Sequence, residues 1–272
     1  MVNGDSVAIR NKERVLSLGR CCFESFYYQR TGMPIEATYA GRWSRPAGHP
    51  DDKVLIHPNA AGPERKAGTV ISSPGGWYDA GDYNKYIVNS AYSIGLMQAI
   101  YARFPDYFIR QRVNIPESGN HTPDLLDEMY YNLRWMLTMQ DPADGGVYHK
   151  LTTPSFEGFI KPTECRQPRY VVQKSVTAAL DYAAALAQAS ALFAPYEEDY
   201  PAFRQWLYRL PNVLTPGQKR IRKRSIIRTS STSNINLPWL RELTVIVVPM
   251  TNSSGRLPSS ILLRESLFTG NK

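Results

Sequence analysis

Cysteine is scarce in this sequence, which has three among its 272 residues: Cys21, Cys22 and Cys165. Two of them are adjacent, and adjacent cysteines rarely bridge each other, so the sequence excludes a disulfide framework or a zinc ribbon. We expect the three side chains to be buried as small apolar groups. Three of the four histidines show no metal-ligand spacing, and no strand precedes a phosphate-binding glycine pattern. The sequence therefore predicts neither a metal site nor a cofactor.

Long hydrophobic runs are also missing. No apolar run reaches the roughly 18 residues that a membrane-spanning helix needs. The first residues lack the basic segment and apolar stretch that mark a signal peptide. Hydrophobic residues nevertheless make up 43% of the chain, which is enough for a sizeable core. We expect a globular chain with no membrane span.

Acidic residues and tyrosines almost disappear near the C-terminus. Residues 1–210 contain 22 Lys or Arg and 22 Asp or Glu, whereas residues 211–272 contain 10 and 2, so the tail carries the whole net charge of +8. None of the 17 tyrosines follows Tyr208, and the tail has 15 Ser or Thr. We interpret residues 1–210 as one unit and residues 211–272 as a basic Ser/Thr-rich tail.

The tail contains the basic run KRIRKR, residues 219–224. Such a run suits phosphate contacts, but no stacking aromatics surround it, so we predict no nucleic-acid function. The simultaneous loss of acidic residues, tyrosines and helical periodicity suggests a reading-frame change near residues 206–210. The alternative is a genuine Ser/Arg-rich extension, and translation of the other frames would separate the two.

Apolar residues recur every three or four positions in five segments, which predicts a mainly α fold. The expected helices lie within residues 5–30, 87–104, 123–137, 175–193 and 201–210. Thr122 is expected to cap the third helix, and Pro105 to end the second, whose apolar face includes Ile100 and Phe104. Eight alanines between Ala178 and Ala191 would let a neighbouring helix approach the fourth closely.

Residues 31–76 show no period and predict a long loop, and strand signals are few. Amphipathic helices joined by long loops are typical of helical hairpins packed around a common centre. Functional residues would then lie on the loops at one end of the helices.

The segment GGWYDAGDYNKY, residues 75–86, places two carboxylates three positions apart among aromatic residues. Asp79 and Asp82 flank Ala80 and Gly81, so a turn could aim both carboxylates at one water molecule. One carboxylate would take the proton of that water, as glycoside hydrolysis requires. Trp77, with the tyrosines of the segment, would offer flat faces for sugar rings. The simpler alternative is that Asp82 caps the following helix and Asp79 closes a turn.

The segment PGGWYDAGDYNKY also carries a resemblance, together with QRTGMPIEATYAGRWSRPAGHPDD before it and IPESGNHTPDLLDEMYYNLRWMLTMQDPADGGVYHKLTT after it. These motifs resemble glycoside hydrolase family 9, the endoglucanase and cellulase family, from residue 5 to about residue 208. The resemblance implies an (α/α)6 barrel that cleaves β-1,4-glucans with inversion. It also implies that Asp82 is the catalytic base, that Asp79 helps to hold the water, and that His149, Trp77 and Tyr83 contact the sugar.

The resemblance stops where the composition changes. The general acid of the family is a Glu in the last barrel helices, and residues 209–272 show no matching element. The resemblance thus implies part of a barrel without its general-acid half.

Three interpretations remain open: a cellulase-type glycosidase, an inactive fragment with residual glucan binding, and an interaction module formed by the basic tail. Because insoluble glucan cannot enter a cell, the first implies a secreted, extracellular or periplasmic protein. The oligomeric state is left open.

Overall fold

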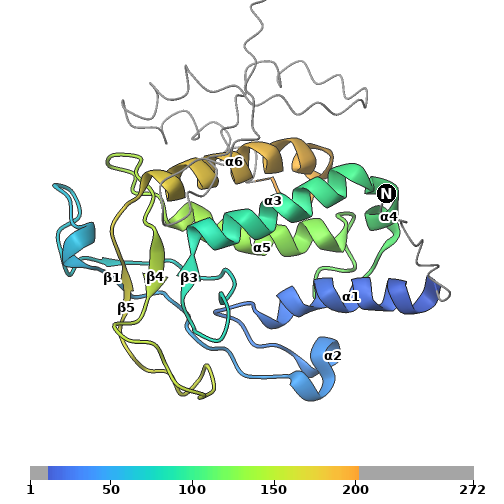
Figure 1. Ribbon diagram of the computed structural model, residues 1–272, viewed down its shortest axis with the longest axis horizontal. Coiled ribbons are helices and arrows are strands. Elements are labelled where there is room, and N and C mark those ends of the chain that lie inside the picture. The colour runs from blue at the N-terminus through green and yellow to red at the C-terminus, as the bar shows by residue number, and fades with distance from the viewer. Residues whose placement is uncertain (1–11, 202–272) are drawn as a thin grey trace, which may run out of the picture.

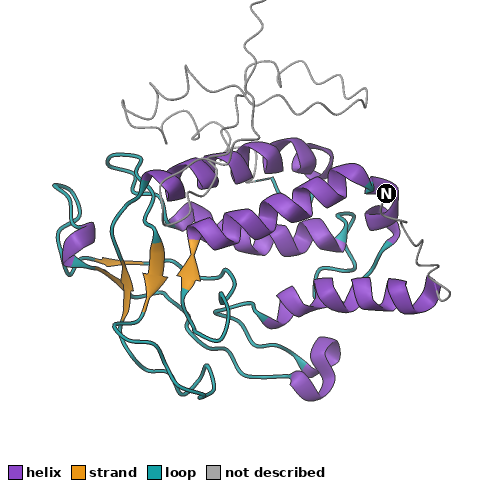
Figure 2. Cartoon of the chain, in the orientation of Figure 1, coloured by secondary structure: helices purple, strands orange, loops and turns teal. Residues whose placement is uncertain are grey.

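The computed structural model describes residues 12–201, and in this range the fold is mainly α, as predicted. Its α-helices are α1 (Lys12–Tyr28), α2 (Ala37–Ala40), α3 (Ile87–Arg103), α4 (Pro105–Arg110), α5 (Asp124–Thr138) and α6 (Val176–Phe193). The helices gather on one side and the strands on the other (Figure 2). The proposed boundary at residue 210, the tail and most of the expected fifth helix lie outside the described residues.

The long helices alternate in direction. α3 and α6 both run away from the sheet, whereas α1 and α5 run towards it (Figure 1). α3 begins directly after strand β3, and α6 begins a few residues after strand β5. The N-termini of α3 and α6 therefore meet at the end of the molecule that carries the sheet and its loops.

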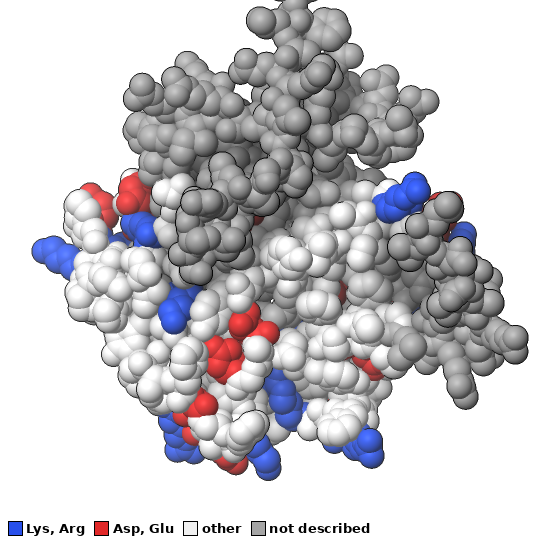
Figure 3. All heavy atoms as spheres, viewed as in Figure 1, with Lys and Arg blue, Asp and Glu red and all other residues white. Residues whose placement is uncertain are grey.

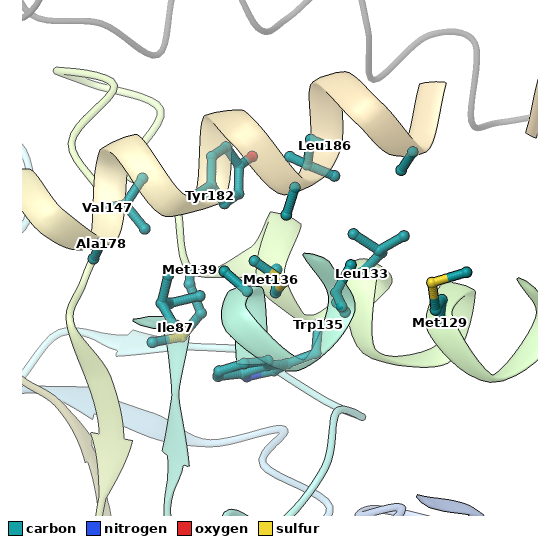
Figure 4. Close-up of a cluster of buried hydrophobic side chains, with 14 of the residues drawn as sticks. Ile87, Met129, Leu133, Trp135, Met136, Met139, Val147, Ala178, Tyr182 and Leu186 are labelled. Carbon is teal, nitrogen blue, oxygen red and sulfur yellow. The ribbon is translucent and has the colours of Figure 1, made fainter. Parts of the chain in front are cut away.

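Small and sulfur-containing side chains fill the space between α3, α5 and α6. Figure 4 shows Leu133 and Met136 of α5 on the side that faces α6, whose Tyr182 and Leu186 belong to the same buried cluster. The alanine-rich sequence of α6 places several methyl groups at the buried face: Ala178, Ala179, Ala185 and Ala189. The two parallel helices are also joined by a hydrogen bond of 2.8 Å from the Gln98 side chain of α3 to the backbone oxygen of Ala185. The close approach of α3 to the alanines of α6 thus agrees with the prediction from the sequence.

By length and composition alone, α6 with the turn that follows it (Val176–Tyr196) could cross a membrane. Some 56% of this apolar segment is nevertheless buried inside the fold. It packs mainly against α3. This is the profile of a core helix.

Two expectations are wrong, the helix cap at Thr122 and the burial of the cysteines. The N-cap of α5 is Pro123 and not Thr122, whose hydroxyl instead donates to Asp199 at 2.7 Å. Pro105 ends α3, as predicted, and also begins α4, because proline fits the first turn of a helix. Cys21 and Cys22 are exposed and Cys165 is half-buried. The cysteines of α1 face outwards because this helix packs into the core through Phe23, Phe26 and Tyr27.

The expected loop over residues 31–76 contains short regular elements that no period could reveal. It contains α2 and two strands, β1 (Val54–Ile56) and β2 (Val70–Ile71). These strands join β3 (Lys85–Tyr86), β4 (Lys150–Thr152) and β5 (Arg169–Val171) in one sheet of order β2-β1-β5-β4-β3. The β1–β5 pair is parallel and the other pairs are antiparallel. Strands of two or three residues are too short to show alternation.

Candidate active site

Residues 75–86 form the turn that enters β3 and then α3. Gly75 and Gly76 both have positive φ, at 78° and 85°. A Cβ atom on Gly76 would lie 2.7 Å from Cγ of Trp135, so glycine is needed there for space as well as for backbone conformation. Gly81 itself lies in a bend over residues 80–83, where the tight turn was expected. Gly75 and Gly76 act earlier in the segment. They let the segment pass directly over the indole ring of α5.

A buried ion cluster fixes the base of this segment. The Lys85 ammonium lies 2.7 Å from Asp51, and Arg169 of β5 contacts the same carboxylate at 2.8 Å. Lys85 also donates to the backbone oxygens of Ser73 and Gly75. Burial lowers the pKa of Lys85 to about 8, while Lys85 and Arg169 hold the pKa of Asp51 below its ordinary value against the opposite effect of burial. The cluster ties the segment to β5 and to residue 51 of the preceding loop.

Asp82 is half-buried, and its two carboxylate oxygens differ. Oδ2 accepts hydrogen bonds from the Asn84 amide at 2.8 Å and the Tyr86 hydroxyl at 2.9 Å. Burial and this contact raise the pKa of Tyr86 to about 12, so the phenol remains a donor. No described group donates to Oδ1, although it is shielded from solvent. Such an oxygen is a free acceptor held in a fixed direction.

Asp79 is exposed at the start of the same turn. Its Oδ1 accepts a hydrogen bond of 2.8 Å from the Asn89 side chain of α3, and its backbone N–H donates to the Asn84 oxygen at 3.1 Å. Buried Asn84 therefore holds Asp82 with its side chain and Asp79 with its main chain. The structure brings the two carboxylates to one turn and links them through this residue.

The simpler alternative for Asp82, a helix cap, is wrong. The N-cap of α3 is Tyr86, and no side chain caps that helix. Asp82 accepts only from side chains, those of Asn84 and Tyr86, among the described hydrogen bonds. A carboxylate held in this way is positioned for something other than helix capping.

His149, half-buried, precedes β4 at the N-terminal end of α6. Its Nδ1 lies 2.9 Å from the hydroxyl of Ser175, which caps α6 by accepting from the Ala178 N–H. Burial, and then the neighbouring Lys150, lower the pKa of His149. The backbone oxygen of His149 accepts from Ile87 N–H at the first residue of α3. His149 is thus attached to both helices that meet at this end, to α6 through its ring and to α3 through its backbone.

Trp77 lies in the core, which disagrees with the predicted sugar contact. It is 5% exposed, and its Nε1 donates to Glu128 of α5 at 2.7 Å. Arg30 shares this carboxylate. The indole turns inwards because a buried acceptor is available for its N–H. Its part is to anchor the segment to α5.

Tyr83 is half-buried and contacts the loop between β4 and β5. Its hydroxyl donates to the backbone oxygen of Ile160, and its ring packs against His49 and Tyr78 at centroid distances of 5.2 and 5.0 Å. The His49 Nδ1 is 2.6 Å from the Tyr78 hydroxyl. Burial, with Arg169 next in effect, lowers the pKa of His49 to about 4, so this ring is neutral near pH 7. Tyr83 therefore connects the turn to the loop between β4 and β5.

Asn84, Lys85 and His49 are the residues of this site that sequence reasoning missed. Asn84 and Lys85 lie inside the quoted segment, but no spacing rule marks an amide or a buried lysine as structural. His49 lies in the segment GHPDD, whose sequence shows no metal-ligand spacing and gives no sign of the buried tyrosine partner. Among the described residues, no group of three or more His, Cys, Asp or Glu could hold a metal ion.

The glycosyl hydrolase family 9 profile matches residues 20–203, which include the turn, the sheet and α6. The chain belongs to glycosyl hydrolase family 9. It is 72% identical over 203 residues to the xyloglucan-specific endo-β-1,4-glucanase BoGH9A of Bacteroides ovatus, covering 74% of this chain and 35% of that protein. It is 39% identical over 176 residues to endoglucanase D of Acetivibrio thermocellus, covering 64% and 27%.

Solved structures of the family have the same arrangement. A Bacteroides ovatus GH9 structure superimposes with a TM-score of 0.72 at 70% identity, covering 73% of this chain and 37% of that one. A metagenome-derived family 9 endoglucanase gives a TM-score of 0.65 at 34% identity, covering 72% and 35%. The fold is part of the (α/α)6 barrel of these proteins. The chain spans about a third of the length of these relatives.

Proposed function

We propose that this chain carries the water-activating half of an inverting endo-β-1,4-glucanase site, with Asp82 as the catalytic base. The observation that carries the proposal is the asymmetry of the Asp82 carboxylate, whose Oδ2 is fixed by two donors while Oδ1 has no described partner. A general base needs a fixed carboxylate with one free lone pair. The chain belongs to a family whose members compared above include endoglucanases. This membership supports the role of Asp82 as catalytic base.

In this mechanism one water molecule reaches Asp82 Oδ1, which is shielded from bulk solvent, and lies between the two carboxylates of the turn. Asp82 Oδ1 takes one proton as the water oxygen bonds to the anomeric carbon, while exposed Asp79 orients the water. The bond from that carbon to the glycosidic oxygen breaks, and its electron pair leaves with the departing sugar. In a polymer that oxygen needs a proton from a second carboxyl group about 6.5–9.5 Å from the base. Attack from the face opposite the leaving group produces the α-anomer.

The substrate is an internal β-1,4-glucosidic bond of cellulose or a related β-glucan. The xyloglucan-specific relative favours a xylose-substituted glucan main chain. On the face shown in Figure 3, acidic and basic side chains of the described residues are interspersed rather than gathered by sign. A neutral polysaccharide needs no single-sign surface. From the size of such a substrate we propose that the protein is secreted, extracellular or periplasmic, which fractionation of expressing cells would test.

Whether the chain is an active enzyme or an inactive glucan-binding fragment depends on whether it has a general acid. We propose that the 272-residue chain lacks it, so that the chain binds glucan without cleaving polymer. Dinitrophenolate is a good leaving group that departs without a proton, so dinitrophenyl β-cellobioside requires only the base. We expect the full chain to hydrolyse this glycoside to α-cellobiose and to release no reducing sugar from xyloglucan or carboxymethylcellulose.

Asp82→Asn keeps the shape of the side chain but cannot accept the proton. We expect it to lower the rate on the activated glycoside about 10²- to 10⁴-fold, with binding retained. The anomer is read by proton NMR immediately after cleavage. Equal rates for Asp82→Asn and the wild type, or a β-anomer as first product, would overturn the proposal.

A further inference from the structure

The loop between β4 and β5, residues 153–168, is fastened to the catalytic turn at two points. At its start the Thr153 N–H donates to the Asn84 side chain at 3.0 Å, and further along the Ile160 oxygen accepts from the Tyr83 hydroxyl. In Figure 1 this loop and the turn before β3 both extend from the same side of the sheet. The loop is therefore held beside Asp82 by residues of the turn itself.

One cation links Phe156 of this loop to the residue that holds the base. The Lys150 ammonium lies 5.3 Å from the Tyr86 ring centroid and 5.9 Å from that of Phe156, so one cation contacts both rings. The hydroxyl of Tyr86 donates to Asp82. A cation between two rings fixes their relative position, and only one side chain then separates Phe156 from the tyrosine that holds Asp82.

Both phenylalanines of the loop face solvent. Phe156 is 69% exposed, and Phe159, which adjoins the anchored Ile160, is fully exposed. An exposed aromatic ring on an anchored loop beside a catalytic turn is typical of a binding surface. Its flat face matches the C–H face of a glucose ring, and anchoring reduces the entropy lost on binding.

We propose that Phe156 and Phe159 form a sugar-binding platform, which takes glucose units of the glucan main chain beside Asp82. This inference rests on the proposed function, because it names where the same substrate binds. It makes the loop a determinant of affinity for the polymer. The platform needs no general acid, so binding to the full chain tests it directly.

The test is titration of the full chain with cellohexaose and with a xyloglucan oligosaccharide by isothermal calorimetry. Phe156→Ala is expected to raise Kd about ten-fold for both ligands, and Phe156→Trp to restore wild-type affinity. The matched control is Phe104→Ala. Phe104 is 55% exposed and also contacts a cation, Arg103 at 5.7 Å, but it lies at the opposite end of α3. Thermal unfolding of each variant should match that of the wild type.

The outcomes separate the two proposals. Unchanged affinity in Phe156→Ala, with the wild type binding both oligosaccharides, overturns the platform and leaves the catalytic assignment standing. An equal loss in Phe104→Ala also overturns it, because the effect would not belong to the loop. A wild-type chain that binds neither oligosaccharide overturns the proposed function and the platform together. Loss in Phe156→Ala alone, with recovery in Phe156→Trp, supports the platform.

Discussion

Asn84 is the residue on which the geometry of both carboxylates depends. Its amide donates to Asp82 Oδ2, its amide oxygen accepts from the Thr153 N–H, and its backbone oxygen accepts from the Asp79 N–H. It is 1% exposed. A buried amide with all these partners orders the turn and the loop together. Its role is positioning, since we place it in contact with neither water nor sugar.

Replacing Asn84 tests that role. Asn84→Ala leaves the Thr153 N–H without its acceptor, so we expect a loss of about 1–3 kcal/mol in the free energy of unfolding. Asn84→Asp keeps the acceptor but removes the donor to Asp82 and adds a like charge beside it. Because a buried carboxylate beside Asp82 is unfavourable, we expect Asn84→Asp to be no more stable than Asn84→Ala at neutral pH, and to shift the pH profile of activated-glycoside hydrolysis. Urea unfolding and rates at several pH values measure both effects. An Asn84→Ala chain as stable as the wild type, or an Asn84→Asp chain with the wild-type pH profile, would contradict the role.

At the residue scale, sequence reasoning could identify chemistry but not orientation. The spacing of Asp79 and Asp82 pointed to one turn, and the structure places them on one turn. Nothing in the sequence distinguished Trp77, which turns towards Glu128, from Tyr83, which turns towards the loop. That choice depends on where a buried hydrogen-bond partner lies, and the partner here is distant in sequence, 51 residues from Trp77.

The first turn of α6 combines a helix cap with a contact to the site. The Ser175 hydroxyl accepts from the Ala178 N–H at 3.1 Å and lies 2.9 Å from His149 Nδ1. Ser175→Ala should lower the free energy of unfolding by about 1 kcal/mol, the usual effect of losing a cap. Ser175→Thr keeps the hydroxyl and serves as the control. Urea unfolding measures both, and a stability of Ser175→Ala equal to the wild type would show that the hydroxyl does not act as a cap.

The first turn of α5 contains a buried carboxyl group with a raised pKa. Burial raises the pKa of Asp127 to about 7 from an ordinary 3.8, although hydrogen bonds from Asn120 and Tyr200 act to lower it. Nearby Glu117 and Asp124 add to the rise. Between about pH 4 and pH 7 the folded state therefore binds more protons than the unfolded chain. The contribution of Asp127 to stability falls as pH rises through this window and is constant above it.

Asp127→Asn removes this titration while keeping the acceptor for Tyr200. We expect the variant to gain stability over the wild type as pH rises from about 4 to 7, by at most about 4 kcal/mol. Below about pH 4 the titration of Asp127 should not change the difference in stability between the variant and the wild type. Urea unfolding at about pH 5 and about pH 8 provides the comparison. A difference between the two proteins that is independent of pH would contradict the raised pKa.

At the scale of elements, periodicity predicted the long helices and missed the sheet. α3, α5 and α6 bury enough residues for a 3.6-residue period to show, and their bounds agree with the predicted segments to within a few residues. The strands are two or three residues long, and partners such as β1 and β5 lie far apart in sequence. Pairing of this kind is set by tertiary contacts, which a local pattern does not contain.

At the scale of the whole molecule, one face of α3 is apolar and uncovered in the described structure. Tyr92, Leu96, Ile100 and Phe104 recur every four residues and are between 40% and 67% exposed. The sequence pattern placed Ile100 and Phe104 on the buried face, and for these two the prediction is wrong. The other described helices thus leave this apolar face of α3 exposed. This chain spans 35% of its Bacteroides ovatus relative.

The central claim is that Asp82 removes the proton from the attacking water, and chemical rescue tests it most directly. Azide is a nucleophile that needs no base, so it can replace the activated water in Asp82→Ala. The measurement is the reaction of dinitrophenyl β-cellobioside with the full-length Asp82→Ala chain, with and without sodium azide, followed by NMR of the product. We predict negligible cleavage without azide, and with azide a restored rate that yields α-cellobiosyl azide. A variant that azide does not rescue, or a product of β configuration, would contradict the account.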